Sequence, residues 1–277
     1  MNIRLSSFAM CRLFACAGMF SEKEVIATLK AFRRIAKLGV IPPVPGIKRG
    51  HTEGWGLVAY KNGDIVYEKK RKAIAFRDPE LLYSLPRLAR RQPDTIIAHV
   101  RKMTYGMVAS RNNHPFVFGP YSFAHNGSVD ETEKLPLKSY FKDNIKGTTD
   151  SERLFAYFLQ RLYAKPNRET TDVQASFKKL IEYIHKHHSY TAMNIVLSNS
   201  THLWAYRDYN PENELVKKYD LASYFTLYYA LRKGKTLFVS SEKMELPGVK
   251  WHLLGNKQGI IMNIKTHALQ TFDWSKG

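Results

Sequence analysis

Apolar residues recur at helical spacing in four stretches of the chain. In the first stretch they follow the capping box Ser21-Glu22-Lys23-Glu24, and Gly39 supplies the stop; these apolar residues are Val25, Ile26, Leu29, Phe32 and Ile35. This pattern predicts a helix over about residues 22–38. Asp78 before Pro79 predicts the start of a second helix, which runs to about residue 91. Two further helices are expected over residues 151–164 and 173–188.

Between the helices, short runs rich in β-branched and aromatic residues predict strands. Asn62-Gly63 separates the first two runs and is a strong hairpin signal. Blocks of strands that alternate with pairs of helices predict an α+β fold, in which sheets pack face to face and helices lie outside. The expected strands cover residues 55–60, 65–68, 95–101, 116–125, 191–197 and 203–207, with others near Lys233-Gly234 and residues 256–259.

The composition is typical of a protein with one sizeable core. The 277 residues are 44% hydrophobic and no Ser/Gly/Pro-rich linker divides them, so we expect one domain. Two cysteines do not form a disulfide framework, and in a regular strand Cys11 and Cys16 would point to opposite faces. A reducing cytoplasm fits this use of cysteine. No run approaches the ~20 apolar residues of a membrane span, no spacing of ligands suggests zinc, and we expect neither a metal nor a cofactor.

The net charge of +19 raises the question of an acidic partner. Such a charge favours contact with polyanions at low salt. The basic residues are scattered, however, and no RNA- or DNA-binding signature accompanies them. A solvated basic surface is the commoner use of such charge, so we do not expect nucleic acid to be the main partner.

Cys11 opens a series of short motifs that carry chemistry. The four downstream motifs are HTEGWG at residues 51–56, AHVR at 98–101, AHNG at 124–127 and GTTDSE at 147–152. Their order and spacing, which extend over nearly the whole chain, resemble the class II glutamine amidotransferases, which are N-terminal-nucleophile hydrolases. The resemblance implies the four-layer αββα sandwich of that fold type.

Cys11 is the candidate nucleophile. A cysteine at a free N-terminus combines nucleophile and base, because its α-amine has a pKa near ~8 and can accept the thiol proton directly or through water. A lone cysteine is more often a small buried hydrophobe, and Cys16 keeps that interpretation. The downstream motifs favour catalysis for Cys11.

Asn126 and Gly127 are the candidate oxyanion hole. At the end of a strand, an Asn side-chain amide and a Gly backbone N–H can both point at one developing oxyanion. Asn-Gly is also an ordinary turn signal. The family resemblance implies the oxyanion role for both residues.

Arg101 and Asp150 are the candidate substrate anchors. A guanidinium can bind an α-carboxylate with two parallel hydrogen bonds, and Asp150 could accept from an α-ammonium group. Just before a helix, Asp150 or Thr149 would also be a good cap. The resemblance implies that Arg101 and Asp150 recognise the α-amino-acid end of a γ-glutamyl group. We expect Trp55 and Gly56 to shape the wall of the pocket.

The resemblance implies attack by the sulfur of Cys11 on the γ-carbonyl of glutamine or of a γ-glutamyl compound. Ammonia or an amine leaves, and water hydrolyses the γ-glutamyl thioester to glutamate. The chain is most similar to the standalone branch of the family, and a synthase subunit that consumes ammonia is a further candidate partner. A second class stays open, namely a catalytically silent family member whose basic surface binds an acidic partner or RNA.

Residues 1–10 precede the nucleophile and form an expected N-terminal extension, with the amidotransferase domain over residues 11–277. An acylated α-nitrogen cannot act as the base, so this extension bears directly on activity. It is a mis-assigned start with Met10 as the true one, a removable propeptide, or a sign that the catalytic terminus never forms. The sequence leaves these alternatives open.

Overall fold

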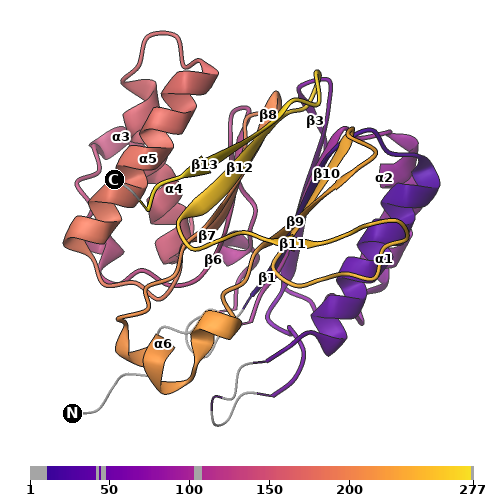
Figure 1. Ribbon diagram of the computed structural model, residues 1–277, viewed down its shortest axis with the longest axis horizontal. Helices are drawn as coiled ribbons and strands as arrows, with labels where there is room; N and C mark the ends of the chain where they lie inside the picture. Colours follow the sequence, from indigo (N-terminus) through magenta and orange to yellow (C-terminus); the bar gives the residue numbers. More distant parts are fainter. Residues whose placement is uncertain (1–10, 42–43, 45–47, 103–107, 276–277) are drawn as a thin grey trace.

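Two β-sheets lie face to face at the centre of the molecule, and helices cover both outer faces (Figure 1). This computed structural model describes residues 11–41, 44, 48–102 and 108–275. One sheet is covered by α1 (Glu22–Leu38) and α2 (Pro79–Arg90), and the other by α4 (Asp150–Tyr163) and α5 (Thr170–His187). The four layers confirm the expected α+β class and the αββα arrangement.

The first sheet has seven strands in the order β11-β9-β10-β1-β4-β2-β3, and all its neighbouring strands are antiparallel. β1 lies at its centre, and every residue of that strand is buried. The strands in chain order are β1 (Arg12–Gly18), β2 (Trp55–Lys61), β3 (Asp64–Arg71), β4 (Thr95–Val100), β9 (Tyr228–Arg232), β10 (Thr236–Ser240) and β11 (His252–Leu253).

The second sheet has six antiparallel strands in the order β13-β12-β8-β7-β6-β5. Its strands are β5 (Phe116–Phe118), β6 (Tyr121–Asn126), β7 (Asn194–Ser198), β8 (His202–Arg207), β12 (Gln258–Asn263) and β13 (Leu269–Asp273). Short helical turns complete the chain: α3 (Ser139–Asp143), α6 (Glu214–Lys218), and the 3-10 turns η1 (Ser110–Asn112), η2 (Thr132–Lys134) and η3 (Leu221–Ser223).

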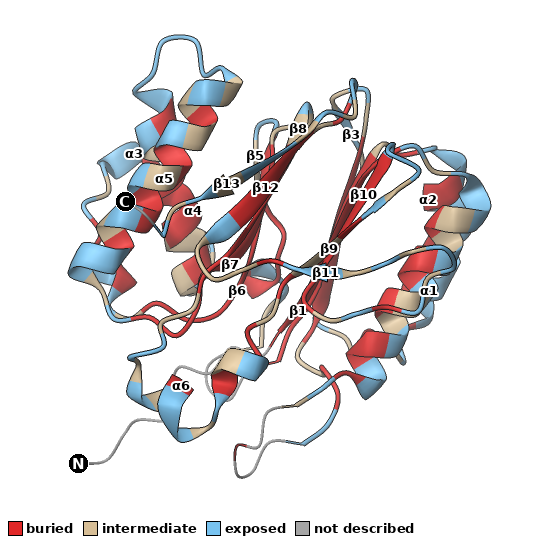
Figure 2. Cartoon of the chain, viewed as in Figure 1, coloured by how far each residue is buried: buried red, intermediate tan, exposed pale blue. Residues whose placement is uncertain are grey.

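Buried residues lie along the strands and on the sides of the helices that face the sheets (Figure 2). Their apolar side chains form three clusters, one in each space between neighbouring layers of backbone. The alternation of side chains along β1 contributes to two of these clusters. Leu13 and Ala15 pack in the layer between the sheets, whereas Phe14 and Cys16 pack beneath α1 and α2. Because β1 is apolar on both faces, it can be covered on both sides, as the centre of a sandwich requires.

The sequence pattern correctly predicted most of the helices and strands, and the predicted bounds agree best with the structure for α1. Ser21 forms the expected capping box with Glu24, and α1 spans residues 22–38 as expected. The Asn62-Gly63 hairpin joins β2 to β3, with φ values of 51° and 96° at its two central residues. Both values lie in the left-handed region that such two-residue turns require.

Three expectations about elements need correction. The single strand expected over residues 116–125 is a hairpin of β5 and β6 that turns at Gly119-Pro120. The helix expected from residue 173 begins at Thr170. β1 was not among the expected strands. The run Ile41-Pro42-Pro43-Val44-Pro45-Gly46 cannot continue a helix and predicts a loop near the site entrance, but most of it lies outside the described residues. The motif Thr104-Tyr105-Gly106, which also fits the family pattern, lies wholly outside them.

Candidate active site

Cys11 lies at the start of the central strand of the seven-stranded sheet. It directly precedes β1, and its side chain is 2% exposed. Arg12 pairs with Val100 of β4, which brings Cys11 alongside Arg101 at the end of β4. Since side chains alternate along a strand, Cys11 points in the direction of Leu13, into the layer between the sheets.

Arg101 faces the same layer. It follows β4, in which Ile97 packs between the sheets, and alternation gives Arg101 the same direction. Its backbone N–H donates to the carbonyl oxygen of Gly54 at 2.8 Å, which fixes the end of β4 against the chain that enters β2. The guanidinium-bearing residue is 6% exposed. Cys11 and Arg101 are therefore neighbours on one face of one sheet.

Asn126 reaches the same layer from the opposite sheet. It is the last residue of β6, which contacts β1, and Ala124 two positions earlier packs between the sheets. Asn126 is fully buried, and neither its Nδ2 nor its Oδ1 has a hydrogen-bond partner in the described part of the chain. A buried amide left unsatisfied costs about 1–3 kcal/mol. Such a group is typical of a site that a ligand completes.

The residues on both sides of Asn126 hold it in place. Gly127 has a φ of 144°, and a Cβ atom there would lie 1.9 Å from the carbonyl oxygen of Ala192, so only glycine fits. His125 points to the helix side of β6, where Nδ1 lies 2.9 Å from Ser151 Oγ and Nε2 lies 3.0 Å from Ala192 O. A carbonyl only accepts, so Nε2 carries the proton. The unprotonated Nδ1 and the Oδ1 of Asp150, 3.1 Å from the hydroxyl, are both acceptors for the one hydroxyl proton of Ser151.

Asp150 is the first residue of α4, and the helix cap is Thr149. The hydroxyl of Thr149 accepts from the backbone N–H of Glu152 at 3.2 Å, which settles the question of the cap. The carboxylate of Asp150 accepts from the backbone N–H groups of Val129 at 2.9 Å and Ser151 at 2.7 Å. The Ser151 hydroxyl also lies within hydrogen-bond distance of Oδ1, at 3.1 Å. These bonds orient the carboxylate and leave acceptor capacity chiefly on Oδ2.

Burial raises the pKa of the Cys11 thiol to about 11. A backbone hydrogen bond from Lys102 and the charge of Arg101 lower the pKa, whereas Glu53 and Asp150 raise it. In its neutral form the thiol donates to the carbonyl oxygen of Lys102 at 3.7 Å. The three charged residues are therefore close enough to the sulfur to act on it. With this pKa, the thiolate fraction at pH 7 is about 10⁻⁴, so the nucleophile needs a base.

Arg12 and Tyr224 hold the Cys11 backbone, a role that the sequence analysis missed. The carbonyl oxygen of Cys11 accepts from Arg12 Nη1 at 3.2 Å and from the Tyr224 hydroxyl at 3.4 Å. The Arg12 guanidinium lies over the Tyr224 ring and pairs with Glu242 at 2.9 Å. An arginine inside an otherwise apolar strand is a local signal, but nothing near Tyr224 in sequence points to Cys11.

Trp55 does not face the site, so the expectation that it shapes the wall of the pocket is wrong. Its side chain packs beneath the helices on the outer face of the sheet, and its Nε1 donates to Asp78 at 2.9 Å. Gly56 instead faces His114, because a Cβ atom on Gly56 would lie 2.1 Å from the His114 carbonyl oxygen. The missing side chain of Gly56 therefore lets the backbone of His114 approach closely, and it does not open space for a substrate.

Four histidines near this end of the sandwich are buried. They are His51, His99, His114 and His125, each 4% exposed or less. The rings of His99 and His114 lie 4.3 Å apart. Burial lowers the pKa of both, and the neighbouring Arg101 lowers each further. Within the described ranges, no three His, Cys, Asp or Glu side chains are grouped as metal ligands.

The model of the family described as glutamine amidotransferases class-II matches residues 10–233 of the chain. The chain belongs to this family. The match includes Cys11 and the four downstream motifs, with GTTDSE as the last of them.

Two curated relatives show how this class II glutamine amidotransferase chain compares in sequence. The uncharacterized protein MJ1515 from Methanocaldococcus jannaschii is 31% identical over 60% of this chain and 45% of its own length. YafJ from Escherichia coli, named as a candidate glutamine amidotransferase, is 27% identical over 56% of this chain and 60% of its own. The matches thus span about half the length of these relatives.

Solved structures share the class II glutamine amidotransferase fold. The glutamine PRPP amidotransferase of B. subtilis aligns with a TM-score of 0.61 and 14% identity, over 96% of this chain and 50% of that one. A glutamine aminotransferase class-II domain protein from Silicibacter pomeroyi aligns with a TM-score of 0.60 and 17% identity, over 96% of this chain and all of that one. In the described part of this chain, no helix is both long and apolar enough to span a membrane.

Proposed function

We propose that the protein is a cysteine-nucleophile amidohydrolase that cleaves the γ-amide of glutamine or of a γ-glutamyl compound through a γ-glutamyl thioester. One observation carries the proposal. Cys11 and Arg101 of one sheet point into the same layer as the buried, unpartnered amide of Asn126 from the other sheet. Nucleophile, anchor and oxyanion donor therefore converge at one end of the sandwich, in a place shielded from water.

In the proposed reaction, the α-amine of a terminal Cys11 accepts the thiol proton, and the sulfur attacks the γ-carbonyl carbon. The oxyanion of the tetrahedral intermediate accepts hydrogen bonds from Asn126 Nδ2 and the backbone N–H of Gly127. As the C–N bond breaks, the protonated amine returns the proton to the leaving nitrogen. Water, activated by the same amine, then attacks the thioester and releases glutamate and the free thiol.

The proposed anchors set the direction of the substrate. Arg101 would bind the α-carboxylate, and Asp150 would accept from the α-ammonium. Both lie close enough to Cys11 to act on the pKa of its thiol, which supports one small substrate in contact with anchors and nucleophile. A synthase partner that would consume the ammonia belongs to the same proposal.

The direct test measures products from protein with a free Cys11 terminus. Glutamine should release ammonia, and a γ-glutamyl-p-nitroanilide should release the amine. Comparing the two kcat/KM values decides which leaving group the site prefers. If neither substrate yields glutamate, while RNA or an acidic protein binds tightly at ~50 mM salt and is released as salt rises, the silent basic binding protein replaces this proposal.

Replacement of Asn126 by Ala should lower kcat by about 10²–10³-fold and leave KM nearly unchanged, because the amide acts on the oxyanion and not on bound substrate. Its polar atoms bond nothing in the described chain, so the unfolding temperature should stay the same or rise. Ser122→Ala, on the same face of β6 and equally buried, is the matched control. A parallel loss of stability and activity would identify Asn126 as structural instead.

Replacement of Arg101 by Ala should weaken substrate binding by about 2–5 kcal/mol, seen chiefly in KM, because a desolvated carboxylate loses its charged partner. Arg101→Lys should keep part of the affinity, since an ammonium retains the charge and loses the paired hydrogen bonds. Steady-state kinetics of each variant measure KM, and a thermal unfolding curve tests whether the variant is folded. An unchanged KM in a folded Arg101→Ala protein would show that the carboxylate binds elsewhere.

A further inference from the structure

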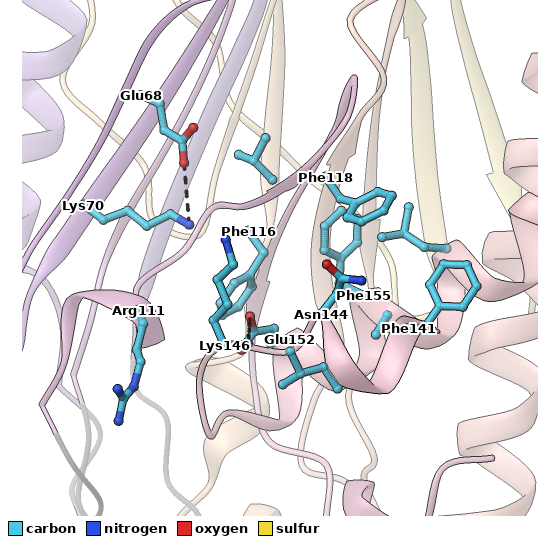
Figure 3. Close-up of a pocket in the computed structure, with 14 residues that line it drawn as sticks. Glu68, Lys70, Arg111, Phe116, Phe118, Phe141, Asn144, Lys146, Glu152 and Phe155 are labelled. Carbon is cyan, nitrogen blue, oxygen red and sulfur yellow. Dashed lines mark hydrogen bonds and ion pairs between the residues drawn. The ribbon is translucent and has the colours of Figure 1, made fainter. Parts of the chain in front are cut away.

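A cavity of about 280 Å³ lies where the outer edges of the two sheets come together, beside the edge strands β3 and β5 and against α4 (Figure 3). Much of its wall is aromatic. The rings come from β5, from α3 and from α4, and they are Phe116, Phe118, Phe141 and Phe155. Charged side chains share the wall with these rings, and a small cavity that combines apolar surface with a few polar groups can hold a small molecule.

Lys70 of β3 and Lys146 of the loop before α4 both line this cavity (Figure 3). Lys70 of β3 is 21% exposed, and its ammonium lies 5.4 Å from the centre of the Phe116 ring. Burial lowers the pKa of Lys70, the carboxylates of Glu68 and Glu152 raise it, and the ammonium of Lys146 lowers it. The two ammonium groups are therefore close enough to repel each other. Exposed Arg111 adds a third cation to the lining.

The two acids of the lining leave this positive charge only partly balanced. Glu152 uses both oxygens within the protein, accepting from the backbone N–H groups of Lys146 at 3.0 Å and Gly147 at 2.6 Å. Glu68 lies 3.7 Å from Lys70 and is 42% exposed, so their ion pair is loose and solvated. An anion placed between the lysines would relieve their repulsion.

We propose that this cavity binds a small organic carboxylate with an apolar, preferably aromatic, body. The carboxylate lies between Lys70 and Lys146, and the body lies against the rings of Phe116 and Phe155. The limited volume restricts the ligand to about one ring and a short chain. The proposal goes beyond the amidohydrolase function and does not depend on it.

This site is separate from the proposed catalytic one. Its lining, as far as the chain is described, includes neither Cys11 nor Asn126. Asn112 lies beside Arg111, and its side chain is joined to the loop before α4. Its Oδ1 accepts from the backbone N–H of Thr148 at 2.9 Å, and its Nδ2 donates to the Thr148 hydroxyl at 3.1 Å. Glu152 of the lining is two positions from Asp150 on α4, so the two sites are neighbours with different linings.

The test uses the full chain and calorimetric titration with 3-phenylpropionate, 3-phenylpropan-1-ol and 3-phenylpropylamine. These probes share one body and carry a negative, a neutral and a positive end group. The carboxylate should bind at least about tenfold more tightly than the alcohol, the magnitude expected for one charged hydrogen bond. The amine should bind more weakly still. Failure of the carboxylate to bind, or tighter binding of the amine, overturns the proposal.

Variants locate the probe. Lys70→Gln and Lys146→Gln should each weaken carboxylate binding by about tenfold or more, whereas Lys186→Gln, an equal charge change at the exposed end of α5, should not. Ala156→Leu places added bulk in the cavity and should abolish binding. Protein labelled at Cys11 by a glutamine-like reagent should bind the probe unchanged. Binding that survives Ala156→Leu, or is lost on labelling, overturns the proposal.

Discussion

Replacement of Cys11 by Ala is expected to reduce glutamine hydrolysis to background, a loss on the order of 10⁶ for removal of a nucleophile. The sulfur forms the bond that the whole reaction depends on, and no other described cysteine faces the layer between the sheets. Covalent labelling by a glutamine-like affinity reagent should disappear with the activity. Intact-mass measurement after labelling and an ammonia assay make the check.

Cys16 offers a matched control for this result. It lies on the same strand, is 1% exposed against 2% for Cys11, and packs beneath α1 and α2 on the opposite face. Cys16→Ala should keep full labelling and nearly full turnover. Labelling that persists in Cys11→Ala and moves to Cys16 would contradict the proposed chemistry.

Blocking the α-amine of Cys11 is expected to lower kcat/KM by about 10²–10⁴-fold, the usual contribution of a general base. The reason lies in the thiol, because burial raises the pKa of Cys11 to about 11 and leaves almost no thiolate at neutral pH. The active species should therefore begin at Cys11. The comparison pairs protein that starts at Cys11 with protein that retains residues 1–10.

The pH profile gives a second reading of the same base. A base acts when it is deprotonated, so kcat/KM should rise with pH and level off above about 8, the ordinary pKa of an α-amine. Without a free amine, activity should keep rising toward the thiol pKa of about 11. Full activity at pH 7 in protein whose mass includes residues 1–10 would rule out the amine as base.

The helices follow closely from local sequence because their signals are local. The capping box of Ser21 and Glu24 and the stop at Gly39 act within a few residues of the helix ends, so α1 appears where expected. The start of α4 shows the limit of such signals. Thr149 and Asp150 are both good caps, and only the observed hydrogen bond to Glu152 N assigns the cap to Thr149.

The strands were harder to locate because their partners are distant in sequence. β1 pairs with β4 and with β10, which is more than 200 residues away. Neither partner is joined to β1 by a short turn, so the sequence beside β1 does not indicate these pairings. The run over residues 116–125 was predicted as one strand although Gly119-Pro120 is itself a local turn signal. The hairpin of β2 and β3 was correctly predicted, because Asn62-Gly63 is a strong turn signal between two strand-like runs.

The candidate site residues came from motifs, and the structure adds their directions. In a sandwich, strands are buried on both faces, so burial alone does not tell which alternate residues face the other sheet. This explains why Trp55 was placed in the pocket and is found beneath α2. The hydrogen bonds from Arg12 and Tyr224 to the Cys11 carbonyl oxygen were missed for another reason, because Tyr224 is 213 positions from Cys11 in the sequence.

The sequence alone predicted the fold class and the family, both of which are confirmed, and it singled out Cys11 as the candidate nucleophile. Composition, periodicity and motif order sufficed for this because they are properties of the chain itself. Only the tertiary structure decided that Cys11 and Arg101 share one face and that Asn126 reaches them from the opposite sheet. It also disclosed the aromatic cavity between β3 and β5, whose lysines are 76 positions apart. Such proximity arises from strand pairing and layer packing, and these depend on contacts that no local pattern specifies.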